Sequence, residues 1–195
     1  TQLGTDIDGE AAGDKSGAIN SVALSNDGTI VAIGAQQNDG ITSSDSDNRG
    51  HVRIYEYSNN SWGKIGSDIA WENGGDQSGY SVALSNDGTI VAIGSIRNDR
   101  TTGNANDNGG QVRVYQRDEN NTTVEPFGWT QRGNAIDGEN SGDNFGSSVA
   151  LSGDGTILAI GAIFNDGITG SDSDNRGHVR VYQYSSNSWE KLGED

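Results

Sequence analysis

Two acidic loops of nearly identical sequence contain the side chains best suited to bind a cation. Each has an Asn-Asp-Gly step followed by Asp-Ser-Asp-Asn-Arg-Gly, and the two copies begin at Asn38 and Asn165. A third, related loop has Ala105 where the others have an aspartate. Ca²⁺ takes six to eight oxygen ligands, and Asp-x-Asp-Asn beside a flexible glycine supplies several of them. We therefore expect loosely bound Ca²⁺. The candidate ligands are Asp39, Asp45, Asp47, Asn48, Asp99, Asp107, Asp166, Asp172, Asp174 and Asn175.

The same aspartates have an alternative role as turn caps. Asp and Asn side chains accept hydrogen bonds from backbone N–H groups two or more residues further on, which closes loops without any metal. The spacing is not that of an EF-hand loop, which ends in a bidentate glutamate. Asp14, Asp76 and Asp143 also recur, one in each lead-in loop, and we interpret them as turn carboxylates rather than ligands.

Residue patterns that indicate catalysis are missing from the sequence. The chain has no cysteine, and it contains no Gly-x-Ser-x-Gly elbow, no P-loop and no zinc-binding spacing. His51 and His178 stand at one repeat position, where the middle copy has Gln111, and we expect them on a solvent-facing side of a strand. These features favour a protein that is not an enzyme.

Surface chemistry adds a few candidate sites. N-glycosylation sequons begin at Asn59, Asn120 and Asn121, in loops that we expect to be exposed. Trp71 stands where the other repeats have glycine, so it is a candidate contact for a sugar or a neighbouring subunit; local packing is the alternative.

The composition limits both the fold and the partners. The 195 residues include 30 glycines and one proline, a composition typical of short strands joined by tight turns. A net charge of -16 argues against nucleic acid and anionic membranes as partners, and makes divalent cations natural stabilisers. No apolar stretch reaches the roughly 18 residues needed to span a membrane, so we expect no membrane insertion.

Three internal repeats must position these side chains. Ser21–Ala35, Ser81–Ser95 and Ser148–Ala162 each read as two apolar runs around a turn such as Asn26-Asp27-Gly28, which predicts a β-hairpin with glycine in the left-handed position. In the first repeat two more strands are expected, at 51–57 and 62–69. Four antiparallel strands per repeat predict an all-β fold of three β-propeller-type blades, either an open array or a segment of a larger propeller.

The repeat boundaries follow from this alignment. We assign residues 21–69 to the first blade, 70–136 to the second with an exposed inserted loop at 118–127, and 137–195 to the third. Residues 1–20 hold a surplus outer strand, because the N-terminal sequence matches 130–139. The tryptophans that open the fourth strand of each repeat are expected to pack between neighbouring blades; they are Trp62, Trp129 and Trp189.

The third repeat resembles a known family. Gly142-Asp143-x-Phe145-Gly146-x-Ser148-Val149-Ala150-Leu151-Ser152, ending at Gly161-Ala162, is similar to the FG-GAP repeat of integrin α-subunit propellers and of secreted bacterial and algal proteins. The other two repeats have Ser16-Gly17 and Ser78-Gly79 in place of the Phe-Gly pair. The resemblance implies a propeller fold and an extracellular or cell-surface location.

Two functions remain open from the sequence. Because an unpaired strand edge is a template for another chain, the surplus strand favours end-to-end, strand-to-edge self-assembly into a fibre or surface array stabilised by cations. The alternative is a calcium-dependent adhesion or recognition segment that binds a glycan or a protein. The expected partners are therefore other copies of the chain, or glycans.

Overall fold

The computed structural model describes residues 1–40, 47–70, 73–100, 107–167 and 175–193. The regular elements of these residues are all β-strands. No helix that could cross a membrane is found in the described part of the chain.

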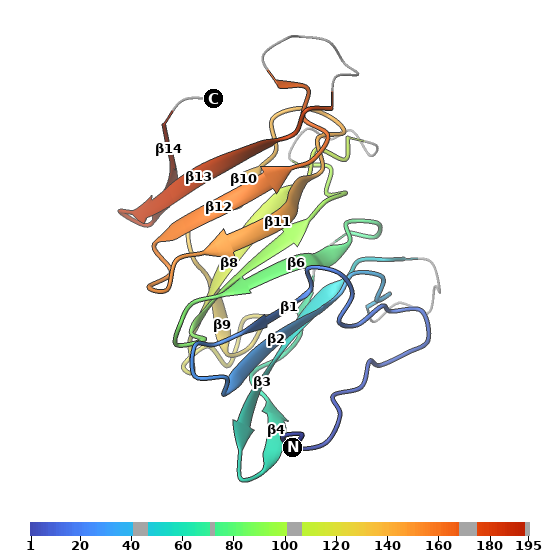
Figure 1. The fold of residues 1–195 in the computed structure, drawn as a ribbon, viewed down its shortest axis with the longest axis vertical. Helices are drawn as coiled ribbons and strands as arrows, with labels where there is room; N and C mark the ends of the chain where they lie inside the picture. The colour runs from blue at the N-terminus through green and yellow to red at the C-terminus, as the bar shows by residue number, and fades with distance from the viewer. Residues whose placement is uncertain (41–46, 71–72, 101–106, 168–174, 194–195) are drawn as a thin grey trace.

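The strands form three antiparallel sheets, one for each sequence repeat, which we call blades 1 to 3 (Figure 1). Blade 1 contains β1 (Val22–Leu24), β2 (Ile30–Ala35), β3 (His51–Ser58), β4 (Ser61–Lys64) and β5 (Ile69–Ala70). Blade 2 contains β6 (Ser78–Leu84), β7 (Ile90–Ser95), β8 (Gln111–Arg117), β9 (Trp129–Gln131) and β10 (Ile136–Asp137). Blade 3 contains β11 (Phe145–Leu151), β12 (Ile157–Ala162), β13 (His178–Ser185) and β14 (Ser188–Leu192). The predicted architecture of three four-stranded blades is confirmed, with the fourth strand divided into two in blades 1 and 2.

The predicted hairpin is confirmed at the start of each blade. In blade 1 the Gly28 N–H donates to the Ser25 carbonyl over 3.0 Å, and Gly28 has a φ of 73°. Asp27 closes the turn by accepting hydrogen bonds from the Ser25 hydroxyl and from the N–H and hydroxyl of Thr29. These bonds, that of Ser25 first, lower the pKa of Asp27 to about 2.

All three blades use the same strand register. Val22 pairs with Ile33, and the pairs Val82–Ile93 and Val149–Ile160 repeat it. Each of these isoleucines then pairs with an arginine of the third strand. Because register fixes which side chains share a face, equivalent residues lie at equivalent places in every blade.

The blades stack face to face, in chain order from the bottom to the top of Figure 1. One core cluster joins blades 1 and 2, and a second joins blades 2 and 3. The second strand of each blade, which is β2, β7 or β12, is apolar on both faces, and every residue of β7 is buried. The core therefore lies in the two junctions between the blades.

The outer strands differ from the prediction. The expected continuous strand at 62–69 is divided into β4 and β5, since the chain turns at Gly66, where φ is 67°. Blade 2 divides its outer strand into β9 and β10 in the same way. The surplus strand expected within residues 1–20 was wrong: that segment forms no strand, apart from an isolated bridge between Ser16 and Ala35. The outer strands β4 and β9 pair with the third strand of their own blade, and no third strand among the described residues pairs with residues 1–20 in this way.

Candidate functional site

The junctions between blades are the most strongly repeated feature of the molecule. In the first junction Val52 and Ile54 of blade 1 pack against side chains of blade 2 that include Val82. In the second, Val112 and Val114 occupy the positions of Val52 and Ile54. We call the side of a blade that faces the preceding blade its leading face, and the side that faces the following blade its trailing face.

Glycine pairs bring the inner strands of adjacent blades into direct backbone contact. A Cβ on Gly34 of blade 1 would collide with the carbonyl oxygen of Gly79 in blade 2, and Gly94 and Gly146 repeat this contact in the second junction. Gly146 belongs to the Phe-Gly pair and Gly94 to the Gly-Ser end of β7. The glycines of the repeat signature are therefore explained by close approach between neighbouring blades.

The recurring tryptophans fix the outer part of each junction, as predicted. The indole N–H of Trp129 donates to the Ile65 carbonyl over 3.3 Å, and that of Trp189 donates to the Arg132 carbonyl over 2.8 Å. Trp129 is fully buried and Trp189 nearly so. Trp62 makes the same bond, over 3.0 Å, to Leu3 in the N-terminal segment.

The hairpin tips form a directional series across the blades. The Asn26 N–H of blade 1 donates to the Asn86 carbonyl over 2.8 Å, and the Asn86 N–H donates to the Gly153 carbonyl over 2.8 Å. At the blade 1 end of the series the Asn26 carbonyl is an acceptor, and at the blade 3 end the Gly153 N–H is a donor. These two groups are a complementary acceptor and donor.

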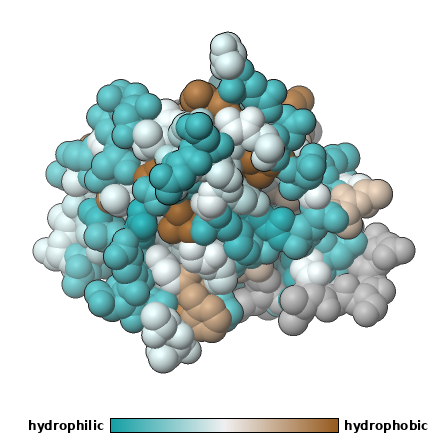
Figure 2. Space-filling model, turned by 90° about the horizontal axis from the view of Figure 1, so that it is seen from below, coloured by the Kyte–Doolittle hydropathy of each residue, from teal (hydrophilic) through white to brown (hydrophobic). Residues whose placement is uncertain are grey.

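The two outermost faces carry the residues that the junctions bury. On the leading face of blade 1, Val22 is 52% exposed, whereas its equivalent Val82 is 6% exposed. On the trailing face of blade 3, Val179 is 67% exposed, whereas Val112 is completely buried. Seen from below, toward blade 1, apolar side chains lie among hydrophilic ones (Figure 2). The two ends of the molecule are unpaired copies of the two halves of a junction.

The described aspartates of the predicted calcium loops bind groups of the protein itself. Asp39 Oδ1 accepts the Asn48 N–H over 2.8 Å, and the pairs Asp99–Asn108 and Asp166–Asn175 repeat this bond. Asp47 forms an ion pair with Arg49, and Asp107 is paired with Arg100. Asp45, Asp172 and Asp174 lie outside the described residues. The geometry supports the turn-closing role, and calcium binding stays a prediction.

A buried Asp–Asn pair closes the lead-in loop of every blade. Asp14, Asp76 and Asp143 each accept a hydrogen bond from the side-chain amide of an asparagine that follows the second strand, over 2.7–3.0 Å. The carboxylates were predicted from the sequence, but their partners were not; these are Asn38, Asn98 and Asn165. The signal was present, because an Asn-Asp dipeptide occurs at this point in all three repeats. Burial raises the pKa of Asp76 to about 6, outweighing the hydrogen bond from Asn98.

One cluster at the leading face of blade 1 has the composition of a metal site. The ligand atoms of Glu10, His51 and Asp68 lie within 4.8 Å of one another. Arg53 forms ion pairs with both carboxylates and Lys64 forms one with Asp68, so two cationic side chains balance the two negative charges. His51 is 4% exposed, which corrects the expectation of a solvent-facing position, and burial lowers its pKa. The cluster is best explained as a structural ion-pair network.

The inserted loop at 118–127 is a strap between two blades. The Ser67 N–H of blade 1 donates to the Phe127 carbonyl over 2.9 Å, and the Ser67 hydroxyl donates to Glu125 over 2.6 Å. Beside the loop lies a groove of about 1070 Å³, lined by residues of the loop, of blade 1 and of β8 and β9. The predicted loop exists, and it packs against a neighbouring blade.

The candidate glycosylation sites differ in how exposed and how engaged their asparagines are. Asn59 and Asn120 are exposed, as the glycosylation prediction requires. The side-chain amide of Asn121 donates to the carbonyls of Pro126 and Trp129, so a glycan there would break both bonds. Trp71 lies outside the described residues.

Comparison with protein families confirms the resemblance for the third repeat. Residues 129–182 match the FG-GAP repeat. The match begins at Trp129, in the outer strand of blade 2, and ends at Tyr182 in blade 3, so it spans a junction. It contains Phe145-Gly146, the pair that the other repeats lack. No curated protein matches the chain.

Several solved structures are similar over most of this chain. A predicted 6-phosphogluconolactonase from Bacteroides uniformis has 13% identity and a TM-score of 0.48, covering 87% of this chain and 38% of that one. The β-propeller domain of the Trilobed protease from Pyrococcus furiosus has 13% identity and a TM-score of 0.44, covering 89% and 41%. An acylaminoacyl peptidase has 13% identity and a TM-score of 0.45, covering 89% and 25%. The chain spans less than half the length of each.

Proposed function

We propose that the chain is a non-enzymatic structural repeat protein that assembles end to end with further copies of itself outside the cell. The observation that carries the proposal is the exposure of junction residues at both ends. Val22 and Leu24 are uncovered at one end and Val179 at the other, while their equivalents inside the chain are covered by the adjacent blade. The resemblance of residues 129–182 to FG-GAP repeats supports the location.

An intermolecular junction would reproduce the internal ones. The leading face of blade 1 in one copy would lie on the trailing face of blade 3 in another, with Gly17 against Gly161. The Gly153 N–H of one copy would then donate to the Asn26 carbonyl of the next. The geometry favours packing of face on face over the pairing of a surplus strand with an edge, because residues 1–20 form no strand.

The strength of this contact is modest. Covering the exposed parts of Val22, Leu24 and Val179 contributes about 3–4 kcal/mol at the usual value for buried apolar side chains. Loss of translational and rotational freedom opposes association by a comparable or larger amount. We therefore expect assembly to depend on protein concentration.

We expect cations to strengthen this assembly. Each copy carries a net charge of -16, so neighbouring copies repel one another. Salt screens this repulsion, and Ca²⁺ bound in the acidic loops would reduce it further.

Sedimentation velocity tests the proposal. The mass distribution is measured from about 5 to 500 µM chain, a range that brackets weak association, in calcium and after chelation. We expect species larger than one chain to grow with concentration. Val179→Asp on the trailing face and Val22→Asp on the leading face should each reduce them. Val124→Asp is the matched control, because Val124 is 66% exposed on the inserted loop. A single-chain mass throughout, or an equal effect of Val124→Asp, would overturn the proposal.

A second candidate function is recognition of a glycan, supported by the groove beside the inserted loop. Its lining includes charged and hydroxyl side chains such as Lys64 and Thr123, which suit a ligand rich in hydroxyl groups. Glycan-array binding that is lost when residues 118–127 are replaced by the shorter connection of blade 1 would support it. Equal glycan binding by both forms, or binding by neither, would contradict it.

A further inference from the structure

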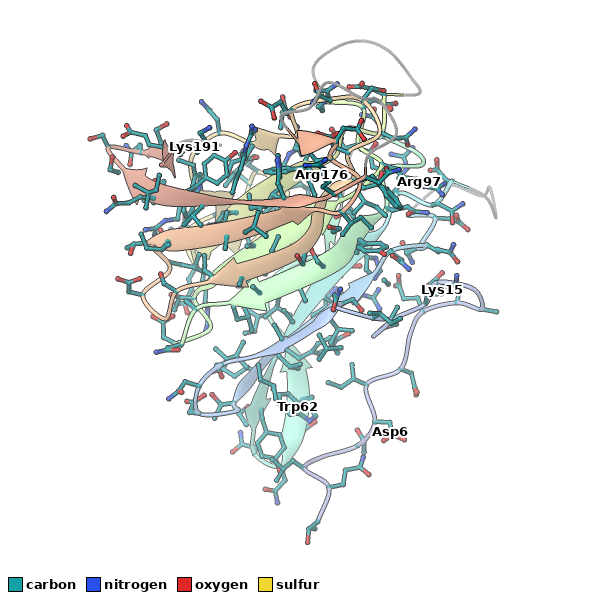
Figure 3. The ribbon with its side chains drawn as sticks, turned by 45° about the horizontal axis from the view of Figure 1, so that its top comes forward. Asp6, Lys15, Trp62, Arg97, Arg176 and Lys191 are labelled. Atoms are coloured by element: carbon teal, nitrogen blue, oxygen red, sulfur yellow. The ribbon has the colours of Figure 1, made fainter. Side chains whose placement is uncertain are left out.

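The N-terminal segment lies on the leading side of blade 1, beside Trp62 (Figure 3). Trp62 donates its indole N–H to the Leu3 carbonyl over 3.0 Å. Gly4, with a φ of 67°, packs against the indole: a Cβ there would lie 3.0 Å from Trp62 Cδ1 and 3.3 Å from Tyr57. Further along, Glu10 forms an ion pair with Arg53.

The junction between blades 2 and 3 contains the same contacts. Trp189 donates to the Arg132 carbonyl, and a Cβ on Gly133 would lie 3.0 Å from Trp189 Cδ1 and 3.3 Å from Tyr184. Glu139 forms an ion pair with Arg180 over 2.5 Å. The N-terminal segment therefore contacts blade 1 as the outer strand of a preceding blade would.

Leu192 and Gly193 are the equivalents of Leu3 and Gly4 at the other end of the molecule. Leu192 is 45% exposed, and a Cβ on Gly193 would meet no atom within 4 Å. Gly193 has a φ of 80°, in the same left-handed region as Gly4 and Gly133. The segment has the backbone of a tryptophan-binding turn, and among the described residues no tryptophan lies against it.

The indole N–H of Trp62 is a single donor, so it cannot bind Leu3 of its own chain and Leu192 of a second copy at the same time. We infer that residues 1–6 are a displaceable cap on blade 1, and that Leu192–Gly193 of a second copy takes their place during assembly. The inference rests on the proposed function. It adds which group of the second copy binds and how binding is controlled: in the free chain, residues 1–6 block the docking face of blade 1.

The cap is held weakly enough to be displaced. Among residues 1–6 all except Gly4 are exposed, and Leu3 is 57% exposed. Gln2 and Asp6 bond to each other, so the bond from Trp62 and the packing on Gly4 attach this segment to the rest of the described chain. Glu10 remains attached through Arg53 when residues 1–6 move away.

Removal of the cap tests the inference. A chain that begins at Ile7 should associate about tenfold more tightly than the full chain in sedimentation velocity. Gly4→Val should have the same direction of effect in the full-length chain, because its Cβ branch meets Trp62 in a backbone conformation that valine avoids. The matched control is Gly142→Val: Gly142 has a φ of 83° and open space around its Cβ. Equal association of the full and shortened chains would overturn the cap while leaving the proposed function intact.

A peptide of residues 190–195 separates the two ideas if no chain associates. The probe is added to ¹⁵N-labelled protein, and the indole N–H resonance of Trp62 is followed by NMR. We expect the resonance to shift in the chain that begins at Ile7 and to shift far less in the full chain. The same peptide carrying Gly193→Val should have no effect. Equal shifts in both chains, or a shift in neither, would overturn the inference.

Discussion

Gly34 and Gly161 occupy the same position in blades 1 and 3, but only Gly34 has a following blade against it. A Cβ on Gly34 would collide with the Gly79 carbonyl, which is backbone and cannot move without separating the blades. A Cβ on Gly161 would lie 2.5 Å from the Ser148 hydroxyl, which can rotate away. We expect Gly34→Ala to destabilise the fold by about 3 kcal/mol, the upper part of the range for overpacking, and Gly161→Ala by less than about 1 kcal/mol.

Thermal unfolding followed by circular dichroism measures the difference. For a chain of this size, about 3 kcal/mol corresponds to a fall in Tm of about 6–12 °C. The measurement is made at low micromolar concentration, where end-to-end contacts contribute least. Association between copies at high concentration should show the opposite order of effects. Gly161→Ala should reduce association, because its methyl group would meet Gly17 of a second copy. Equal loss of stability in both variants would refute the reasoning from close backbone approach.

Other predictions concern the acid pair, the tryptophans and the charge. Asp76 has its pKa raised to about 6 by burial, so the folded chain binds more protons than the unfolded chain between about pH 4 and 6, and stability falls as the pH rises through that window. Asp76→Asn should remove about 1–2 kcal/mol of that fall, allowing for solvent screening, in urea titrations at several pH values; an unchanged pH profile would contradict this. Trp129→Phe should cost about 2–3 kcal/mol, because Trp129 is fully buried and the change leaves the Ile65 carbonyl without its donor. Trp62→Phe should cost less than about 1 kcal/mol, because Trp62 is only partly buried; similar costs would contradict the assigned difference in burial. Raising NaCl from about 20 to 300 mM should strengthen association between copies of this acidic chain, and weaker association in sedimentation would show that attraction between charges dominates.

The three internal repeats of the sequence were enough to predict the blades and their register. The alternation of apolar runs with Asp-Gly turns is a local signal, and the turn at Asp27 and Gly28 is closed by groups three residues apart. The positions of the tryptophans followed from the same repetition, because side chains in one register share one environment. These features depend on contacts that recur in every repeat.

Features that depend on contacts between residues far apart in the sequence were missed. The division of the outer strand at Gly66 allows the Ile65 carbonyl to accept the Trp129 indole, 64 residues away. His51 looked solvent-facing from the alternation of β3, yet Glu10 of the N-terminal segment covers it. The asparagine partner of Asp76 lies 22 residues further on. The first two of these contacts have no local signature in the sequence, whereas the third is marked by an Asn-Asp dipeptide that recurs in every repeat.

Cysteine cross-linking tests the central claim, the head-to-tail contact between copies, most directly. The chain contains no cysteine. In the internal junctions a Cβ on Gly79 or Gly146 would lie 3.1 Å from Val52 or Val112, the valines equivalent to Val179 of blade 3. A mixture of a Gly17→Cys chain and a Val179→Cys chain, oxidised at high concentration, should therefore give a disulfide-linked dimer of twice the 20.4 kDa chain mass. Each variant alone should give far less. Absence of the mixed dimer, or equal dimer formation by Val179→Cys alone, would contradict the head-to-tail junction.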